Sequence, residues 1–188
     1  MKKQNALLQQ YSMFQLILIA IIAALGIATK PIITPLVHIF TGPLFIPGGA
    51  IAGGFYMLWL VLGKGLVNKP GAATLIGLVQ GILVIAIGTM GTHGVMSIIT
   101  YTLPGLVVDL VFLVSKKKQY FLLHYVVGCL AANVTGTLLS NLLFFRLPFV
   151  SLVFILSTAA LSGGIGGVIG YHLIKGVQKI KVLDFLWE

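Results

Sequence analysis

The chain has little charge, and above all little negative charge. Only 8% of its 188 residues are charged, and the acids are three, Asp109, Asp184 and Glu188. The mean hydropathy is +1.10, and 59% of the residues are hydrophobic. This composition predicts an integral membrane protein. The net charge of +9 does not indicate nucleic-acid binding, because the basic residues fall in short clusters between long apolar runs.

Other common functional signatures are missing from the sequence. A single cysteine, Cys129, excludes an internal disulfide and a cysteine-based metal cluster. Without a GxxxxGK[ST] motif the chain does not hydrolyse ATP by the P-loop route, and HExxH and GxSxG are also absent. We therefore expect no catalytic residue, no cofactor and no metal site. The remaining classes are a passive binder, a channel or one subunit of a larger machine.

The apolar residues form six segments that are long enough to cross a bilayer, at roughly 17 to 25 residues each. Charged or glycine- and proline-containing breaks separate the segments. The sequence thus predicts an all-α membrane protein, with residues 1–188 as a single six-helix transmembrane domain in the cell membrane. The expected spans are about 12–30, 47–63, 71–89, 95–114, 120–143 and 149–174.

The basic residues predict how these spans are oriented. With the N-terminus inside, ten Lys residues fall on the inner side, and only Lys30 and Arg146 fall outside. Because Lys and Arg accumulate in cytoplasmic loops, this distribution is a strong orientation signal. We expect both termini to be cytoplasmic.

The stretch 27–54 links the first two predicted spans and differs from an ordinary loop. It is apolar, yet it holds four of the seven prolines, Pro31, Pro35, Pro43 and Pro47. Repeated prolines break helices, and apolar irregular backbone is tolerated in a membrane only where it packs on protein, lies at the interface or lines a cavity. We predict a non-helical, outward-facing lid hinged near Gly42 and Gly48-Gly49.

Polar side chains mark a candidate site beneath this lid, because they are costly in hydrocarbon unless they have partners. Asn133, Thr137 and Asn141 follow one another at intervals of four and share one helix face. Helix-to-helix bonding is the better interpretation of any single hydroxyl, but we favour a ligand site for this aligned face. The expected substrate-binding residues are His38, Gln80, His93, Tyr101, Asn133, Thr137 and Asn141.

Asp109 is the only acid within a predicted span, and two interpretations of it differ in function. It is either a proton or cation site, or a carboxylate that pairs with a lysine or caps backbone groups. We favour pairing or capping, because ion-coupled transport usually needs more than one buried ionisable group.

Small residues in the first and last spans indicate close helix contacts. For the glycine-rich stretch 162–170 we favour packing within the bundle. The stripe Ala20, Ala24 and Ala28 fits packing or a docking face for another subunit equally well.

Several segments resemble a known family, the S components of energy-coupling factor (ECF) vitamin transporters. The shared features are the alanine stripe in LILIAIIAALGIATK, the long outward first loop and six spans. Residues 68–73 (NKPGAA) and 104–112 (PGLVVDLVF) look most like the YkoE-type thiamin/hydroxymethylpyrimidine branch. The resemblance implies a chain that binds a vitamin or vitamin precursor from outside. It also implies docking through Ala20, Ala24 and Ala28 onto a transmembrane coupling subunit that carries two ATPase subunits.

One departure from that branch concerns the ligand's charge. That branch has acidic residues in its membrane segments that suit a cationic ligand, whereas residues 72–88 here (AATLIGLVQGILVIAIG) contain no acid. A cationic, thiamin-like ligand would therefore lack a counter-ion in the outer cavity. A neutral or large ligand, including a corrinoid such as cobalamin, therefore stays open. The alternatives from other classes are a membrane enzyme or assembly factor that uses the outer residues His38 and His93, and a small autonomous transporter.

Overall fold

The computed structural model describes residues 11–44, 47–88, 93–114 and 120–179, and the regular structure in these ranges is entirely helical. Short 3-10 helices occupy Gly42–Leu44 (η1) and Gly94–Met96 (η2), and a π-helix occupies Asn141–Phe145 (η3). The α-helices are α1 (Met13–Ala28), α2 (Lys30–Thr41), α3 (Gly48–Val67), α4 (Ala72–Ile87), α5 (Ser97–Val114), α6 (Leu122–Ser140) and α7 (Phe149–Gln178).

The number of membrane-crossing helices differs from the prediction. In the described part of the chain, five helical stretches are long and apolar enough to cross a bilayer: Met13–Thr41, Gly48–Val67, Gly94–Val114, Leu122–Phe145 and Phe149–Gln178. The third expected span, about 71–89, corresponds to α4, which is apolar but only 16 residues long. Gly71 precedes the helix and Gly88 follows it, and both have left-handed backbone, with φ values of +81° and +64°. Such backbone suits glycine and stops the helix.

The predicted non-helical lid is wrong for most of its length, because Lys30–Thr41 forms α2 directly after Thr29. Pro31 lies in the first turn, where its missing N–H would have no helical partner in any case. Pro35 lies inside the helix and removes one backbone bond. Lys30 therefore begins a helix within a candidate span and does not lie in an outer loop. The predicted hinges are helical too: Gly42 begins η1, and Gly48 begins α3.

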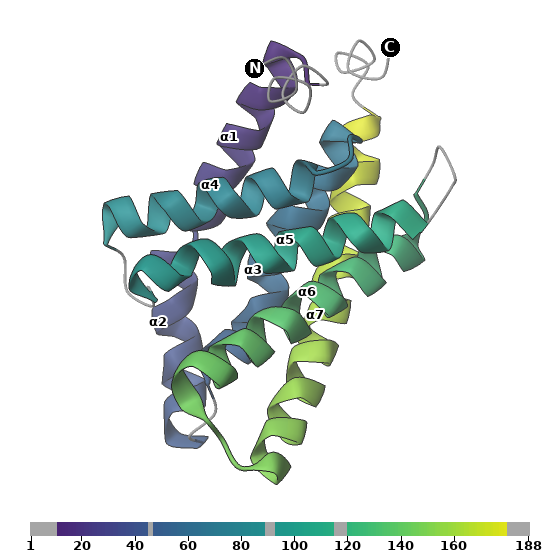
Figure 1. Cartoon of the computed structure of the whole chain (residues 1–188). Helices are drawn as coiled ribbons and strands as arrows, with labels where there is room; N and C mark the ends of the chain where they lie inside the picture. Colours follow the sequence, from purple (N-terminus) through teal and green to yellow (C-terminus); the bar gives the residue numbers. More distant parts are fainter. Residues whose placement is uncertain (1–10, 45–46, 89–92, 115–119, 180–188) are drawn as a thin grey trace.

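The helices are arranged in packed pairs around α3 (Figure 1). α4 and α5 run side by side across the molecule, α6 packs against α7, and α3 packs against α7 and α6. α2 continues along the edge begun by α1. The start of α1 and the end of α7 lie at the same end of the molecule (Figure 1). Which end faces the cytoplasm stays a prediction.

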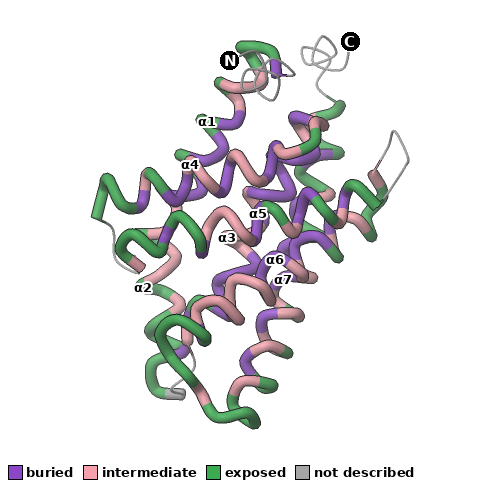
Figure 2. Tube along the Cα trace, in the orientation of Figure 1, coloured by how far each residue is buried: buried purple, intermediate pink, exposed green. Residues whose placement is uncertain are grey.

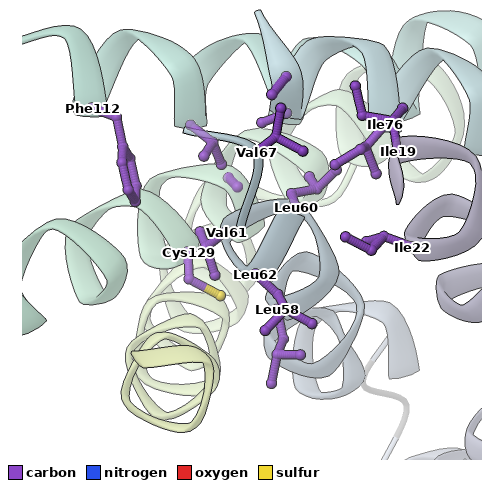
Figure 3. Packing of buried hydrophobic residues seen from close by; sticks show 14 of the residues in the cluster. Ile19, Ile22, Leu58, Leu60, Val61, Leu62, Val67, Ile76, Phe112 and Cys129 are labelled. Atoms are coloured by element: carbon purple, nitrogen blue, oxygen red, sulfur yellow. The ribbon is translucent and has the colours of Figure 1, made fainter. Parts of the chain in front are cut away.

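The apolar core follows α3. Leu58, Leu60 and Val61 are each at most 2% exposed, and they lie among residues of α1, α4, α5 and α6 (Figure 3). Buried positions gather along the centre of the molecule, and exposed ones cover its periphery (Figure 2). Many of the exposed side chains are large and apolar, such as Phe154 and Leu161. This distribution suits a protein whose outer surface contacts lipid.

The glycine-rich stretch of α7 lets three helices approach one another closely. A Cβ added at Gly166 would lie 2.2 Å from the carbonyl oxygen of Gly54 on α3, and one at Gly167 would lie 2.4 Å from that of Tyr125 on α6. Real Cβ atoms do not approach backbone atoms this closely. The prediction that these glycines pack within the bundle is confirmed.

A buried ion pair holds the packed region where α3, α4 and α5 meet. Oδ1 of Asp109 lies 2.9 Å from Nζ of Lys64, and both side chains are at most 3% exposed. Oδ2 of Asp109 accepts hydrogen bonds from the backbone N–H (2.8 Å) and the hydroxyl (2.7 Å) of Thr74. Thr74 lies in the first turn of α4, so the carboxylate caps that helix and faces the positive end of its dipole. Asp109 thus pairs with a lysine and caps backbone, the interpretation that the sequence favoured.

Candidate functional site

A cavity of about 380 Å³ lies beside the N-terminal part of α3 and takes lining residues from all seven α-helices and from η3. Every residue predicted to bind substrate lines it. Although the structure brings these side chains together, their contact with a substrate stays a prediction. They are His38 of α2, Gln80 of α4, His93 before η2, Tyr101 of α5, Asn133 and Thr137 of α6, and Asn141 of η3.

Two of these residues also hold the cavity wall together. Nδ2 of Asn133 donates hydrogen bonds to the carbonyl oxygens of Ala50 (3.1 Å) and Ala159 (2.8 Å), and so joins α6 to α3 and α7. Oδ1 of Asn141 accepts a hydrogen bond from the backbone N–H of Leu147 at 2.9 Å. Asn133 therefore bonds from helix to helix, as the alternative interpretation proposed, and Asn141 holds the connection between η3 and α7. Thr137 lies between them on the same face and is partly exposed.

The main feature that the sequence analysis missed is Lys30. Its Nζ donates to the hydroxyl of Tyr101 and lies 4.2 Å from the centroid of the Tyr101 ring and 4.7 Å from that of Tyr56. The hydroxyl of Tyr56 in turn lies 2.8 Å from Oγ1 of Thr34. Lys30, Thr34 and His38 recur at intervals of four and all line the cavity. That spacing was a readable signal, but the prolines argued against a helix there.

His93 lines the cavity, and three contacts fix its position. Its ring stacks on Phe144 at a centroid distance of 4.4 Å, its Nδ1 lies 3.2 Å from Oγ1 of Thr100, and its backbone N–H donates to Oγ of Ser97. Burial, followed by the nearby charge of Lys30, lowers the pKa of His93 below that of an exposed histidine. The ring is therefore neutral near pH 7.

The ionisable groups that line the cavity, apart from its tyrosines, are Lys30, His38 and His93. Asp109, the acid of the described ranges, is bound to Lys64 and Thr74 away from the cavity lining. Within those ranges no group of three or more His, Cys, Asp or Glu residues is placed to hold a metal ion. The cavity therefore has positive charge and a largely apolar wall, which suits recognition of an organic molecule.

The alanine stripe of α1 lies outside both the cavity and the core. Ala20, Ala24 and Ala28 are all exposed, whereas Ala23 and Gly26 point inward. Gly26 is close-packed, since a Cβ there would lie 2.2 Å from Nε2 of Gln80. The stripe is thus not used for packing within the described bundle, and its role as a docking face stays a prediction.

Comparisons with known proteins identify the kind of molecule that has this cavity. The fold is similar to that of a solved structure described as an S-component of an ECF transporter, with a TM-score of 0.77 and 19% sequence identity. The alignment covers 93% of this chain and 89% of that one. No curated protein matches the chain. A family model described as "ABC-type cobalt transport system, permease component" matches residues 14–135, well over half of the sequence. The chain therefore belongs to this family of transporter components, as a multi-pass protein of the cell membrane with an S-component-like fold.

Proposed function

We propose that the chain is the substrate-binding S component of an ECF-type importer for a vitamin or vitamin precursor, and that its helices form one transmembrane domain. The observation that carries the proposal is the convergence of seven polar residues on one cavity in an S-component-like fold. The chain binds and presents the substrate without changing it. Membership of a transporter family argues against the membrane-enzyme alternative.

The size of the cavity supports a small substrate. Ligand cavities usually measure about 300–1,000 Å³, so about 380 Å³ lies near the lower limit. A compound of one or two rings, such as a thiamin precursor, matches this volume better than a corrinoid does. A bare cobalt ion is a poorer match, because the lining offers two histidines and no carboxylate.

The exposed stripe Ala20, Ala24 and Ala28 supports docking onto a transmembrane coupling subunit with two ATPases. Small side chains let a partner helix approach the backbone of α1 closely. Large apolar neighbours, including Ile17 and Ile21, are also exposed on this helix and extend the surface.

The binding proposal is tested on gently purified protein. Mass spectrometry identifies any retained small molecule, and titration with a vitamin panel measures affinity. We expect saturable binding that Asn133→Ala and Asn141→Ala weaken about tenfold, since each removes a polar contact of the wall. The control is Thr135→Ala, whose hydroxyl bonds only to Ala131 of its own helix. The proposal fails if no compound binds and no coupling subunit co-purifies after co-expression.

The docking proposal has a separate test. Ala20→Trp and Ala24→Trp should prevent co-purification with the coupling and ATPase subunits and leave substrate affinity unchanged. Leu161→Trp, at a 73% exposed position on α7, is the matched control. Uptake into liposomes that hold the chain without any ATPase would instead support the autonomous-transporter alternative.

A further inference from the structure

We propose that the cavity selects substrates that carry an anionic group, a carboxylate or a phosphate, and that this group binds the ammonium of Lys30 beside Tyr56 and Tyr101. The inference rests on the proposed function, since it takes the cavity as the substrate site. It adds the charge of the substrate and the residue that recognises it.

The first observation is that Lys30 has no counter-ion among the residues that the structure describes. An ammonium offers three N–H donors, and the hydroxyl of Tyr101 is its one hydrogen-bond acceptor among the described residues. Of the three acids in the chain, Asp109 is bound to Lys64, and Asp184 and Glu188 belong to the last five residues of the sequence. A charge removed from water without a partner is costly. An anionic ligand would supply the partner that the described residues do not.

The second observation is that Lys64, a buried lysine away from the cavity, is fully paired. Nζ of Lys64 lies 2.9 Å from Asp109 and donates to the carbonyl oxygen of Lys69 at 2.7 Å. Where Lys64 contacts a carboxylate and a carbonyl oxygen, Lys30 contacts only two aromatic rings and one hydroxyl among the described residues. It also lines a cavity of about 380 Å³, so space for an external partner adjoins its ammonium.

The third observation concerns cations. Two tyrosine rings facing one cavity would attract a cationic ligand, but the ammonium of Lys30 already lies over both rings, at 4.7 Å and 4.2 Å. A cationic ligand would be repelled by Lys30 and would find no carboxylate on the described cavity wall. Val37, Met57 and Leu60 contribute apolar surface to the same wall, which suits a ring that bears the anionic group.

The experiment uses the full chain in lipid nanodiscs and probes matched in shape but not in charge. One set is nicotinate, nicotinamide and 1-methylnicotinamide, which are an anion, a neutral molecule and a cation. The other set is pyridoxine 5′-phosphate and pyridoxine, which carry no aldehyde that could react with a lysine, so that the two arms distinguish carboxylate from phosphate. Affinities are measured by isothermal titration for the native chain and for Lys30→Gln, Lys30→Arg and Lys175→Gln. Lys175 is the matched control, because it lies 5.7 Å from the Tyr171 ring and is exposed on α7.

In at least one arm we expect the anion to bind the native chain at least tenfold more tightly than its uncharged counterpart. Lys30→Gln should weaken anion binding by about 10-fold to 100-fold and leave the neutral probe within twofold. Lys30→Arg should keep most of the preference because it keeps the charge, and Lys175→Gln should behave as the native chain. Thermal unfolding confirms that each variant is folded.

Two results overturn the inference and leave the proposed function standing. One is that, in both arms, an uncharged or cationic probe binds as tightly as its anionic counterpart. The other is a co-purified substrate without an anionic group whose affinity Lys30→Gln does not change. If neither a probe nor any vitamin of the panel binds, the proposed function fails, and the inference fails with it.

Discussion

Lys64 and Lys30 both lie inside the helical bundle, but the chain surrounds them differently. Lys64 is at most 2% exposed and is paired with a carboxylate and a carbonyl oxygen. Lys30 is partly buried and contacts two tyrosine rings and one hydroxyl beside a cavity. The first region satisfies its charges internally and holds α3, α4 and α5 together. In the second region, by our inference, the ammonium of Lys30 is available to an anionic substrate.

The residues around the two lysines also differ, because helices pack closely around Lys64 and polar side chains line a cavity around Lys30. Near the ion pair, Gly105 brings the backbone of α5 close to that of α4 at Ala73, and Asp109 caps the start of α4. Around Lys30, polar side chains of several helices face one space. Stability and binding are therefore expected to depend on different residues, and the predictions below test that separation.

The largest expected effect comes from replacing the two lysines one at a time. Lys64→Met should lower the free energy of unfolding by about 3–5 kcal/mol, because it leaves Asp109 buried without its cation. Lys30→Met should leave the free energy of unfolding unchanged or raise it, because Lys30 has no carboxylate partner among the described residues. Chemical unfolding in detergent micelles measures both.

The double variant Lys64→Met/Asp109→Leu is the control for this comparison. It removes both charges and should recover much of the loss, since a buried ion pair can often be replaced by apolar residues at little cost. Equal destabilisation by Lys64→Met and Lys30→Met would contradict the division into a packed and a binding region.

A smaller effect is expected from the glycine contact between α7 and α3. Gly166→Ala should destabilise the protein by about 1–3 kcal/mol, because its Cβ would meet the Gly54 carbonyl oxygen at 2.2 Å. Gly164→Ala is the matched control on the same helix, where a Cβ would meet no heavy atom within 4 Å. It should be neutral or stabilising by up to about 1 kcal/mol, since Ala favours helix over Gly. Thermal unfolding of the two variants measures this difference in stability. A similar loss of stability in both variants would contradict the close contact at Gly166.

The smallest expected effect is a pH dependence in the cavity region. The folded protein lowers the pKa of His93, so the unfolded chain binds the proton more readily than the folded chain does. The contribution of His93 to stability is therefore complete above the pKa of an exposed histidine, about 6.5, and falls as the pH drops below that value. His93→Gln should flatten the stability profile between about pH 7 and pH 5. An unchanged profile in His93→Gln would show that the site does not favour the neutral ring.

Some features of the site were readable from the sequence, because polar residues are rare in apolar runs and each needs a reason. Asn133, Thr137 and Asn141 shared a face at helical spacing, and all three line the cavity. Lys30 was not found, because Pro31 and Pro35 argued against the helix that carries it. Neither proline abolishes α2: one lies in the first turn, and the other removes a single backbone bond.

The sequence by itself determined that the protein is an all-helical membrane protein, because hydropathy and segment length depend only on local composition. It also determined that charge is scarce and mostly positive, so that few acids are available to neutralise a buried cation. Only the tertiary structure decided which lysine receives Asp109 and which one faces the cavity. That choice depends on contacts between α3, α4 and α5 and between α2 and α3, residues far apart in sequence whose proximity no local pattern encodes.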